Sequence, residues 1–142
     1  MLPFKVSFRL GLSVYEQTVY AAQKSVVSGQ LKPGDVFPSV RAISQALKIN
    51  PNTAHKVVAE LTRQGLIEVR PGIGTVVAAI PHASQQQRAG LLKDDMEQLV
   101  VEAKRLHVDL DELVETLTNH WERLSPNSPH TKPEKRLAKE RA

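Results

Sequence analysis

Residues 38–75 read PSVRAISQALKINPNTAHKVVAELTRQGLIEVRPGIGT, and this stretch decides the fold. Ser39 is a good N-cap for a short helix that ends near Leu47. Asn50 caps a second helix, because a proline follows it at the first helical position, where a missing N–H does no harm. Gly65 ends that second helix. Two short helices joined by a tight turn indicate a helix-turn-helix, whose second helix enters the DNA major groove.

A glycine-bent hairpin follows directly. A strand starts near Ile67, and residues 70–77, RPGIGTVV, bend the chain back on itself. Gly72 and Gly74 let the backbone take the positive φ angles that a tight turn needs, and they also allow a close approach to a ligand. The hairpin turns the predicted fold into a winged helix-turn-helix.

The charges of the chain are unevenly distributed. Residues 1–80 contain nine Lys or Arg against four Asp or Glu, residues 81–125 five against nine, and residues 126–142 five against two. A basic first segment followed by an acidic middle segment suggests that only the first faces phosphate. Ordinary solvated surface explains the same charges equally well.

Composition excludes several classes of protein. Aromatic residues make up 4% of the chain, too few for the stacking surfaces that bind single-stranded nucleic acid. Cysteine is absent, which excludes disulfides and thiolate metal sites and fits a cytoplasmic location. No apolar run reaches the roughly 18 residues of a membrane span, so no membrane partner is expected.

The N-terminal part is predicted to hold a strand and a helix. Phe4, Val6 and Phe8 alternate with polar residues, which is the period of a half-buried strand. Ser13 and the glutamate three residues later form a capping box for a helix that stops at Gly29.

Two further helices are predicted after residue 84. Ser84 opens one that extends to about Leu106, and Asp109 caps the next. Their apolar residues recur at the spacing of a helix–helix seam, and those predicted to form it are Leu92, Met96, Leu99, Ala103, Leu106, Leu113, Leu117 and Trp121.

Two such helices cannot bury two apolar stripes by themselves. The stripes must therefore meet either the first domain of the same chain or a second copy, and the charge reversal favours a homodimer. The predicted fold is mainly α with a small β-wing: an N-terminal winged helix-turn-helix over 1–80, a C-terminal two-helix dimerisation segment over 81–125, and a disordered basic tail over 126–142.

At this point the residues resemble a known family, the GntR-family transcriptional regulators. The motifs that carry the resemblance are Tyr15-x-Gln17, Gly29-x-Leu31-x-Pro33-Gly34, Pro38-Ser39-x-Arg41, Asn50-Pro51-Asn52-Thr53, Gly65-Leu66-Ile67 and Gly72-x-Gly74-Thr75. The segment 106–113 is similar to the YtrA subfamily, whose members add two dimerisation helices. The resemblance implies a homodimeric repressor that binds an inverted-repeat operator on double-stranded DNA, often near transporter genes.

The resemblance also implies particular DNA contacts. Transferred position by position, they fall on Arg41, Asn50, Asn52, Thr53, His55, Lys56, Gly72 and Gly74. Arg70, beside the wing glycines, is a further phosphate contact expected from its charge. Each of these residues also has a purely structural explanation, because surface charges, helix caps and turn glycines occur in proteins without any ligand.

This sequence departs from the family pattern at two positions. Val58 replaces a usual tyrosine, which affects local packing, and His107 replaces the glycine that usually ends the first C-terminal helix.

Nothing in the sequence indicates catalysis. No phosphate loop, nucleophile elbow or HExxH pattern is present. His120, Asp109, Asp111 and Glu112 are metal-capable, but their spacing matches no standard site, so neither a metal nor a cofactor is expected. The competing functions are an architectural DNA-binding protein with little sequence preference, and an enzyme or small-molecule receptor that uses the C-terminal segment as its pocket. The sequence does not identify an effector.

Overall fold

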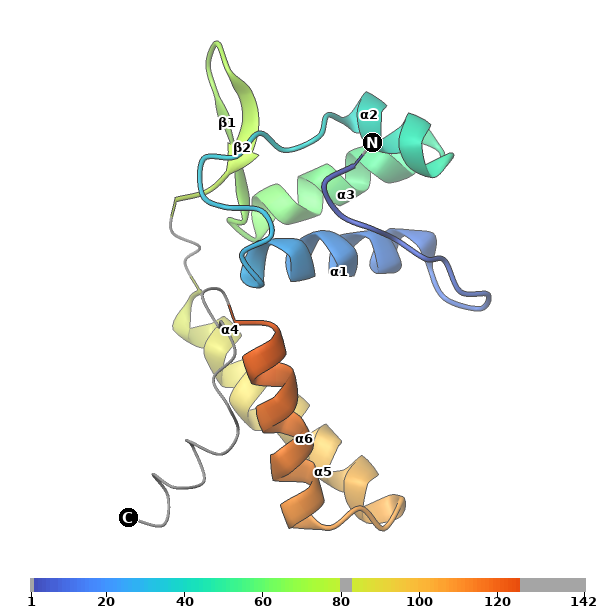
Figure 1. Ribbon diagram of the computed structural model, residues 1–142, viewed down its shortest axis with the longest axis vertical. Coiled ribbons are helices and arrows are strands. Elements are labelled where there is room, and N and C mark those ends of the chain that lie inside the picture. Colours follow the sequence, from blue (N-terminus) through green and yellow to red (C-terminus); the bar gives the residue numbers. More distant parts are fainter. Residues whose placement is uncertain (1, 80–82, 126–142) are drawn as a thin grey trace. The chain divides into compact units, whose positions relative to one another are not determined.

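The computed structural model describes residues 2–79 and 83–125. The chain divides into two compact units, Met1–Ala83 and Ser84–Ala142 (Figure 1). The predicted disordered tail, 126–142, lies outside the described residues.

Three helices form most of the first unit: α1 (Val14–Val27), α2 (Val40–Leu47) and α3 (Pro51–Arg63). Each begins at the predicted cap. The Oγ of Ser13 accepts a hydrogen bond from the N–H of Glu16 at 3.2 Å, and the Oγ of Ser39 accepts one from the N–H of Ala42 at 3.1 Å. These side chains satisfy backbone donors that a helix N-terminus leaves without partners.

The wing consists of two antiparallel strands, β1 (Ile67–Arg70) and β2 (Gly74–Val77). Ile67 pairs with Val77 and Arg70 with Gly74. The segment before α2 runs along β2, where the N–H of Phe37 donates to the carbonyl of Thr75 at 2.8 Å. The winged helix-turn-helix predicted from the sequence is confirmed.

The core of the first unit lies around α3. Both α1 and α2 pack on this helix, whose Ala54, Val57 and Leu61 are buried. They meet Ile43 from α2 and Ala22 from α1. One face of α3 is thus covered by α1 and α2, and the opposite face is exposed.

The strand predicted around Phe4, Val6 and Phe8 is wrong, because this segment forms no strand. A strand needs a neighbour to accept its hydrogen bonds, and β2 is already flanked by β1 and by a bridge between Val76 and Val36. Phe4 instead stacks on the ring of Phe37, with centroids 5.9 Å apart.

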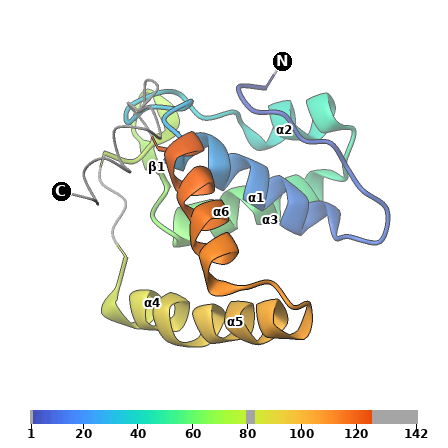
Figure 2. The ribbon, with the colours of Figure 1, turned by 60° about the horizontal axis from the view of Figure 1, so that its bottom comes forward.

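The second unit contains a long helical rod and a final helix. The rod comprises α4 (Gln85–Ala89), the π-helix η1 (Gly90–Asp95) and α5 (Met96–Arg105), and α6 (Leu110–Arg123) follows it. Figure 2 shows α4 and α5 in line and α6 turning away from them. The capping box of Ser84 and Gln87 is complete, and Asp109 caps α6 as predicted.

The rod differs from the uninterrupted α-helix that the sequence predicts. A π-helix carries more residues per turn, because each N–H bonds to the carbonyl five residues back. The interval from Leu92 to Met96 therefore turns through a smaller angle than an α-helical interval of four residues. Leu92 consequently does not continue the stripe of α5 in the predicted register.

His107 has a left-handed backbone, with φ of 60°. This conformation is the one that the usual glycine adopts at a helix C-terminus. The N–H of Val108 then donates to the carbonyl of Ala103 at 2.9 Å, which closes the end of α5. His107 therefore adopts the left-handed conformation that is usual for glycine at the end of a helix.

Candidate DNA interface

The N-terminal half of α3 presents a polar surface. Asn52, His55 and Lys56 are exposed, whereas the helix buries Ala54 and Val57 on the other side. Thr53 lies between the two faces and is half-buried. These residues stand at the start of the helix, the end that helix-turn-helix proteins commonly direct at base edges.

Asn50 caps this helix. Its Oδ1 accepts a hydrogen bond from the N–H of Asn52 at 2.8 Å. The carboxamide oxygen of Asn50 is therefore engaged within the protein, and its amide N–H groups are the part left to donate to a ligand.

Arg41 lies in the first turn of α2 and is exposed. Within the described residues, neither Arg41 nor Lys56 has a carboxylate within ion-pair distance. Both cations are thus available to an anionic partner. Figure 1 shows α2 and the wing on the same side of α3, with α1 on the other side.

The wing carries the other predicted contacts, namely Arg70, Gly72 and Gly74. The glycines Gly72 and Gly74 have φ of 82° and 110°, so both positions require the freedom of glycine. A guanidinium nitrogen of Arg70 lies 3.2 Å from Oε1 of Glu68. Arg70 is therefore partly neutralised, which the sequence analysis did not predict.

A shallow hollow of about 520 Å³ opens between α1 and α3. Its lining contains the predicted Thr53 and Lys56 together with residues to which the sequence analysis assigned no site role, namely Tyr15, Ala59, Glu60 and Arg63. The spacing of 53, 56, 60 and 63 is that of one helix face, so the periodicity of α3 contained this signal.

Glu60 is the centre of a hydrogen-bond network beside the hollow. Arg63 Nε donates to its Oε1 at 2.9 Å, and Gln64 donates to its Oε2 at 2.7 Å. The bond from Arg63, followed by that from Gln64, holds the pKa of Glu60 below its ordinary value. Gln23 of α1 donates to Gln64 at 2.7 Å, so the network ties α1 to α3.

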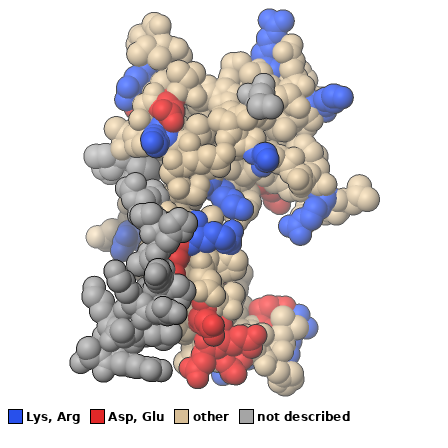
Figure 3. Space-filling view, in the orientation of Figure 1, with Lys and Arg blue, Asp and Glu red and all other residues tan. Residues whose placement is uncertain are grey.

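The surface charges of the two units differ in sign. On the face drawn in Figure 3, Lys and Arg outnumber Asp and Glu over the first unit, whereas Asp and Glu gather over the second. The polar face of α3 therefore belongs to the unit whose charge suits the DNA backbone.

The residues predicted to form the dimer seam are mostly uncovered. Ala103 is buried, and Met96 and Leu113 are half-buried. The remaining members expose between 42% and 71% of their surface, and they are Leu92, Leu99, Leu106, Leu117 and Trp121. Most of this apolar face is therefore accessible in the part of the chain that the structure describes.

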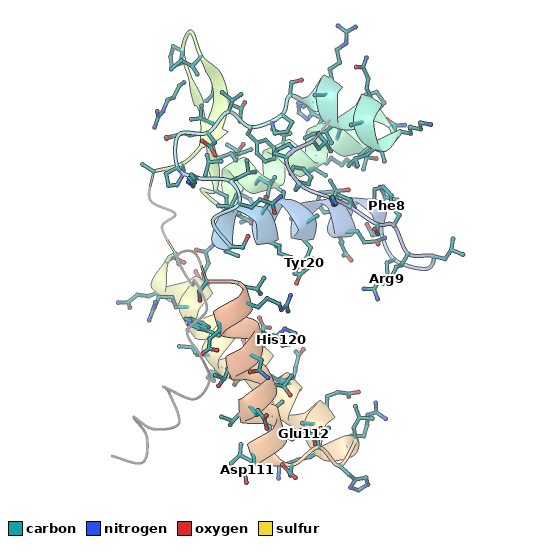
Figure 4. All side chains as sticks on the ribbon, in the orientation of Figure 1. Phe8, Arg9, Tyr20, Asp111, Glu112 and His120 are labelled. Atoms are coloured by element: carbon teal, nitrogen blue, oxygen red, sulfur yellow. The ribbon has the colours of Figure 1, made fainter. Side chains whose placement is uncertain are left out.

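Metal-capable side chains in the second unit lie apart. Figure 4 shows Asp111 and Glu112 near the beginning of α6 and His120 toward its other end. Residues 2–79 and 83–125 contain no group of three or more side chains that could hold a metal ion. Over the same residues, every helix is too short or too polar to cross a lipid bilayer.

Comparison with known proteins identifies the family. The family model for bacterial regulatory proteins of the gntR family matches residues 14–77, which are α1 to β2. The HTH-type transcriptional repressor YtrA of Bacillus subtilis is 32% identical over 108 residues, which cover 75% of this chain and 83% of YtrA. This chain belongs to the GntR family.

The similarity extends beyond the DNA-binding unit. The uncharacterized HTH-type transcriptional regulator YhcF of Bacillus subtilis is 30% identical over 84% of this chain and 95% of its own length. The crystal structure of a transcriptional antiterminator from Listeria monocytogenes aligns with a TM-score of 0.73 and 25% identity, covering 85% of this chain and 91% of that one. This GntR-family chain is thus a YtrA-like DNA-binding transcriptional regulator and not an enzyme.

Proposed function

We propose that this regulator is a homodimeric repressor that binds an inverted-repeat operator. Each protomer contributes one α3 to the major groove of one half-site, and the two-fold symmetry of the dimer matches that of the operator. The regulator works in the cytoplasm, where it has access to the chromosome. Repression is supported by the similarity to YtrA, which is named as a repressor.

The main observation in support of a dimer is the exposed apolar face of the second unit. Leu99, Leu117 and Trp121 expose 42%, 48% and 71% of their surface. Full burial of an exposed large apolar side chain is worth roughly 1.5–3 kcal/mol. In a symmetric dimer each of these side chains is buried once in each protomer, so their burial favours association of the two chains. We therefore propose residues 81–125 as the dimerisation segment and 1–80 as the DNA-binding domain.

The proposed division of work at the DNA follows from side-chain chemistry. Arg41 suits a guanine edge or a phosphate, because its planar guanidinium donates two parallel hydrogen bonds. The start of α3 contributes Asn50, Asn52, Thr53 and His55, and Lys56 neutralises a phosphate. Arg70 and the backbone at Gly72 and Gly74 contact the minor groove or its phosphates.

Promoter occlusion is the proposed mode of repression, and a transporter operon is the proposed target. Two α3 helices held about 34 Å apart would cover adjacent turns of one duplex face. A deletion strain tests the target, because transcripts of the genes beside the regulator's own gene should rise. Unchanged transcripts would argue against local control.

Footprinting on the DNA upstream of the regulator's own gene tests the proposed function. A symmetric pair of protected arms about one helical turn apart is expected. Arg41→Ala should weaken this specific binding by about 1–3 kcal/mol and non-specific binding much less, if Arg41 reads a base. Uniform protection with a steep salt dependence would instead identify an architectural protein.

A further inference from the structure

Lys48 has an unusual backbone for a lysine. It follows α2 directly with φ of 55° and ψ of 47°, in the left-handed helical region. Its Cβ crowds the following carbonyl oxygen in this region, which is why glycine or asparagine is usual there. Among the described non-glycine residues, Lys48 and His107 alone have positive φ.

The backbone around Lys48 is held on both sides. The carbonyl of Ser44 accepts hydrogen bonds from the N–H groups of both Lys48 and Ile49. The Oγ of Ser44 donates in turn to the carbonyl of Ile49 at 2.8 Å, and Ile49 packs against the core. The position of the Lys48 Cβ is therefore set by the fold, while the side chain itself is exposed.

The ammonium group of Lys48 is free. In the part of the chain that the structure describes, it forms no ion pair and no side-chain hydrogen bond. The residue stands in the turn between α2 and α3, two positions before the Asn50 cap. A helix that enters the major groove at its N-terminus brings this turn to the phosphates along the edge of the groove.

We propose that Lys48 binds a DNA backbone phosphate beside the groove that receives α3. The proposal rests on the proposed placement of α3 in the operator and adds a contact to it. A lysine ammonium is a flexible point charge, so it anchors the turn without reading sequence. A glycine at this position would remove the steric cost but also the charge.

One competing explanation is purely structural. Lys48 lies at the C-terminal end of α2, where a positive charge interacts favourably with the helix dipole. If this were its only role, replacement would lower the melting temperature and leave DNA binding unchanged. If Lys48 contacts a phosphate, replacement should instead weaken DNA binding without lowering the melting temperature.

The experiment uses Lys48→Asn and Lys48→Gly, both compatible with a left-handed backbone, and Lys24→Gln as the matched control. Lys24 is an exposed lysine of α1 in the same unit, so its replacement reports the effect of net charge alone. The probes are a duplex from upstream of the regulator's own gene and a scrambled duplex of equal length. Affinities are measured over a range of potassium chloride concentrations, and melting temperatures are measured in parallel.

Both Lys48 variants should bind both duplexes roughly tenfold more weakly at low salt. The slope of log affinity against log salt should fall by about 0.9 for each phosphate that is no longer neutralised, hence by about 1.8 for a dimer. Melting temperatures should be unchanged or higher, since glycine and asparagine adopt the left-handed conformation at a lower steric cost than lysine. Lys24→Gln should keep the slope of the unmodified protein.

A slope and affinity equal to those of the control would overturn the Lys48 contact while leaving the repressor hypothesis intact. Failure of the unmodified protein to prefer the upstream duplex would count against the repressor hypothesis instead. The Lys48 contact is still decided in that case, because the scrambled duplex carries the same phosphates.

Discussion

Asn50 has a structural role that its side-chain geometry already explains, and the proposed DNA contact is a second role. Asn50→Ala should lower the free energy of unfolding by about 1 kcal/mol, because the N–H of Asn52 loses its acceptor. Asn50→Ser keeps an acceptor and should retain most of the stability, but it lacks the amide donors. Denaturant titration and operator affinity should therefore separate the two variants.

If the amide donors contact DNA, Asn50→Ser should bind the operator more weakly than the unmodified protein while unfolding at a similar denaturant concentration. Full operator affinity in Asn50→Ser would assign Asn50 to the cap alone.

Glu68 restrains the wing arginine. Its Oε1 lies 3.2 Å from a guanidinium nitrogen of Arg70, and the side chains of Arg70 and Glu68 expose 42% and 48% of their surface. Glu68→Gln should release Arg70 and raise DNA affinity, roughly threefold at low salt. Anisotropy titrations with labelled duplex measure this change.

A double-mutant cycle separates release of Arg70 from a general change in charge. The gain from Glu68→Gln should shrink when Arg70→Gln is already present. An equal gain in both backgrounds would show that the pair does not control Arg70.

Glu60 supports the polar link between α1 and α3, because it accepts a hydrogen bond from the same Gln64 that Gln23 contacts. The pKa of Glu60 in the folded protein lies below its ordinary value of 4.5, so the folded state favours the carboxylate. The resulting stability is present above pH 4.5 and is lost as the pH falls through the lowered pKa. Glu60→Gln should thus melt at a lower temperature than the unmodified protein at neutral pH, and the gap should narrow in acid.

Glu102 provides the matched control, since its carboxylate bonds to Arg105 on the same helix and ties no other helix. Thermal melts at pH 7 and at about pH 3 compare the two variants across the transition. A gap for Glu60→Gln that persists unchanged in acid would show that packing, not ionisation, causes the difference.

The turn between α5 and α6 carries a steric cost at His107, whose φ is 60°. His107→Gly should raise the free energy of unfolding by about 0.5–1 kcal/mol, because glycine adopts this region without a Cβ clash. Chemical denaturation at a fixed protein concentration measures the gain. A destabilised variant would mean that the His107 side chain makes stabilising contacts that outweigh its backbone cost.

The helices were more predictable than the first strand. Each predicted N-cap residue lies three positions or fewer before the backbone N–H that it bonds, as with Ser39 and Ala42. The alternation of Phe4, Val6 and Phe8 was equally regular, but a strand also requires a free edge on another strand. The π-helix at Gly90–Asp95 escaped prediction because the same residues fit an α-helical pattern.

The proposed homodimer would be held together by the second unit. Leu99 is 42% exposed and lies in the proposed seam. Leu99→Asp should weaken dimerisation by at least about 3 kcal/mol, because two leucine side chains leave the interface and two carboxylates are desolvated there. Sedimentation velocity should then find monomers, and operator affinity should fall with them.

Gln98→Asp is the control, since it adds the same charge at the adjacent exposed position of α5. It should remain dimeric. A Leu99→Asp variant that sediments as a full dimer would contradict the seam assignment without affecting the DNA-binding residues.

The sequence by itself determined where the helices begin, the order of the winged helix-turn-helix and the polar side of α3. These features rest on interactions within a few residues, which local spacing encodes. Only the tertiary structure decided the hollow beside Tyr15 and the bond between Gln23 and Gln64. The last of these joins residues 41 positions apart, and such partners come together only when the helices pack.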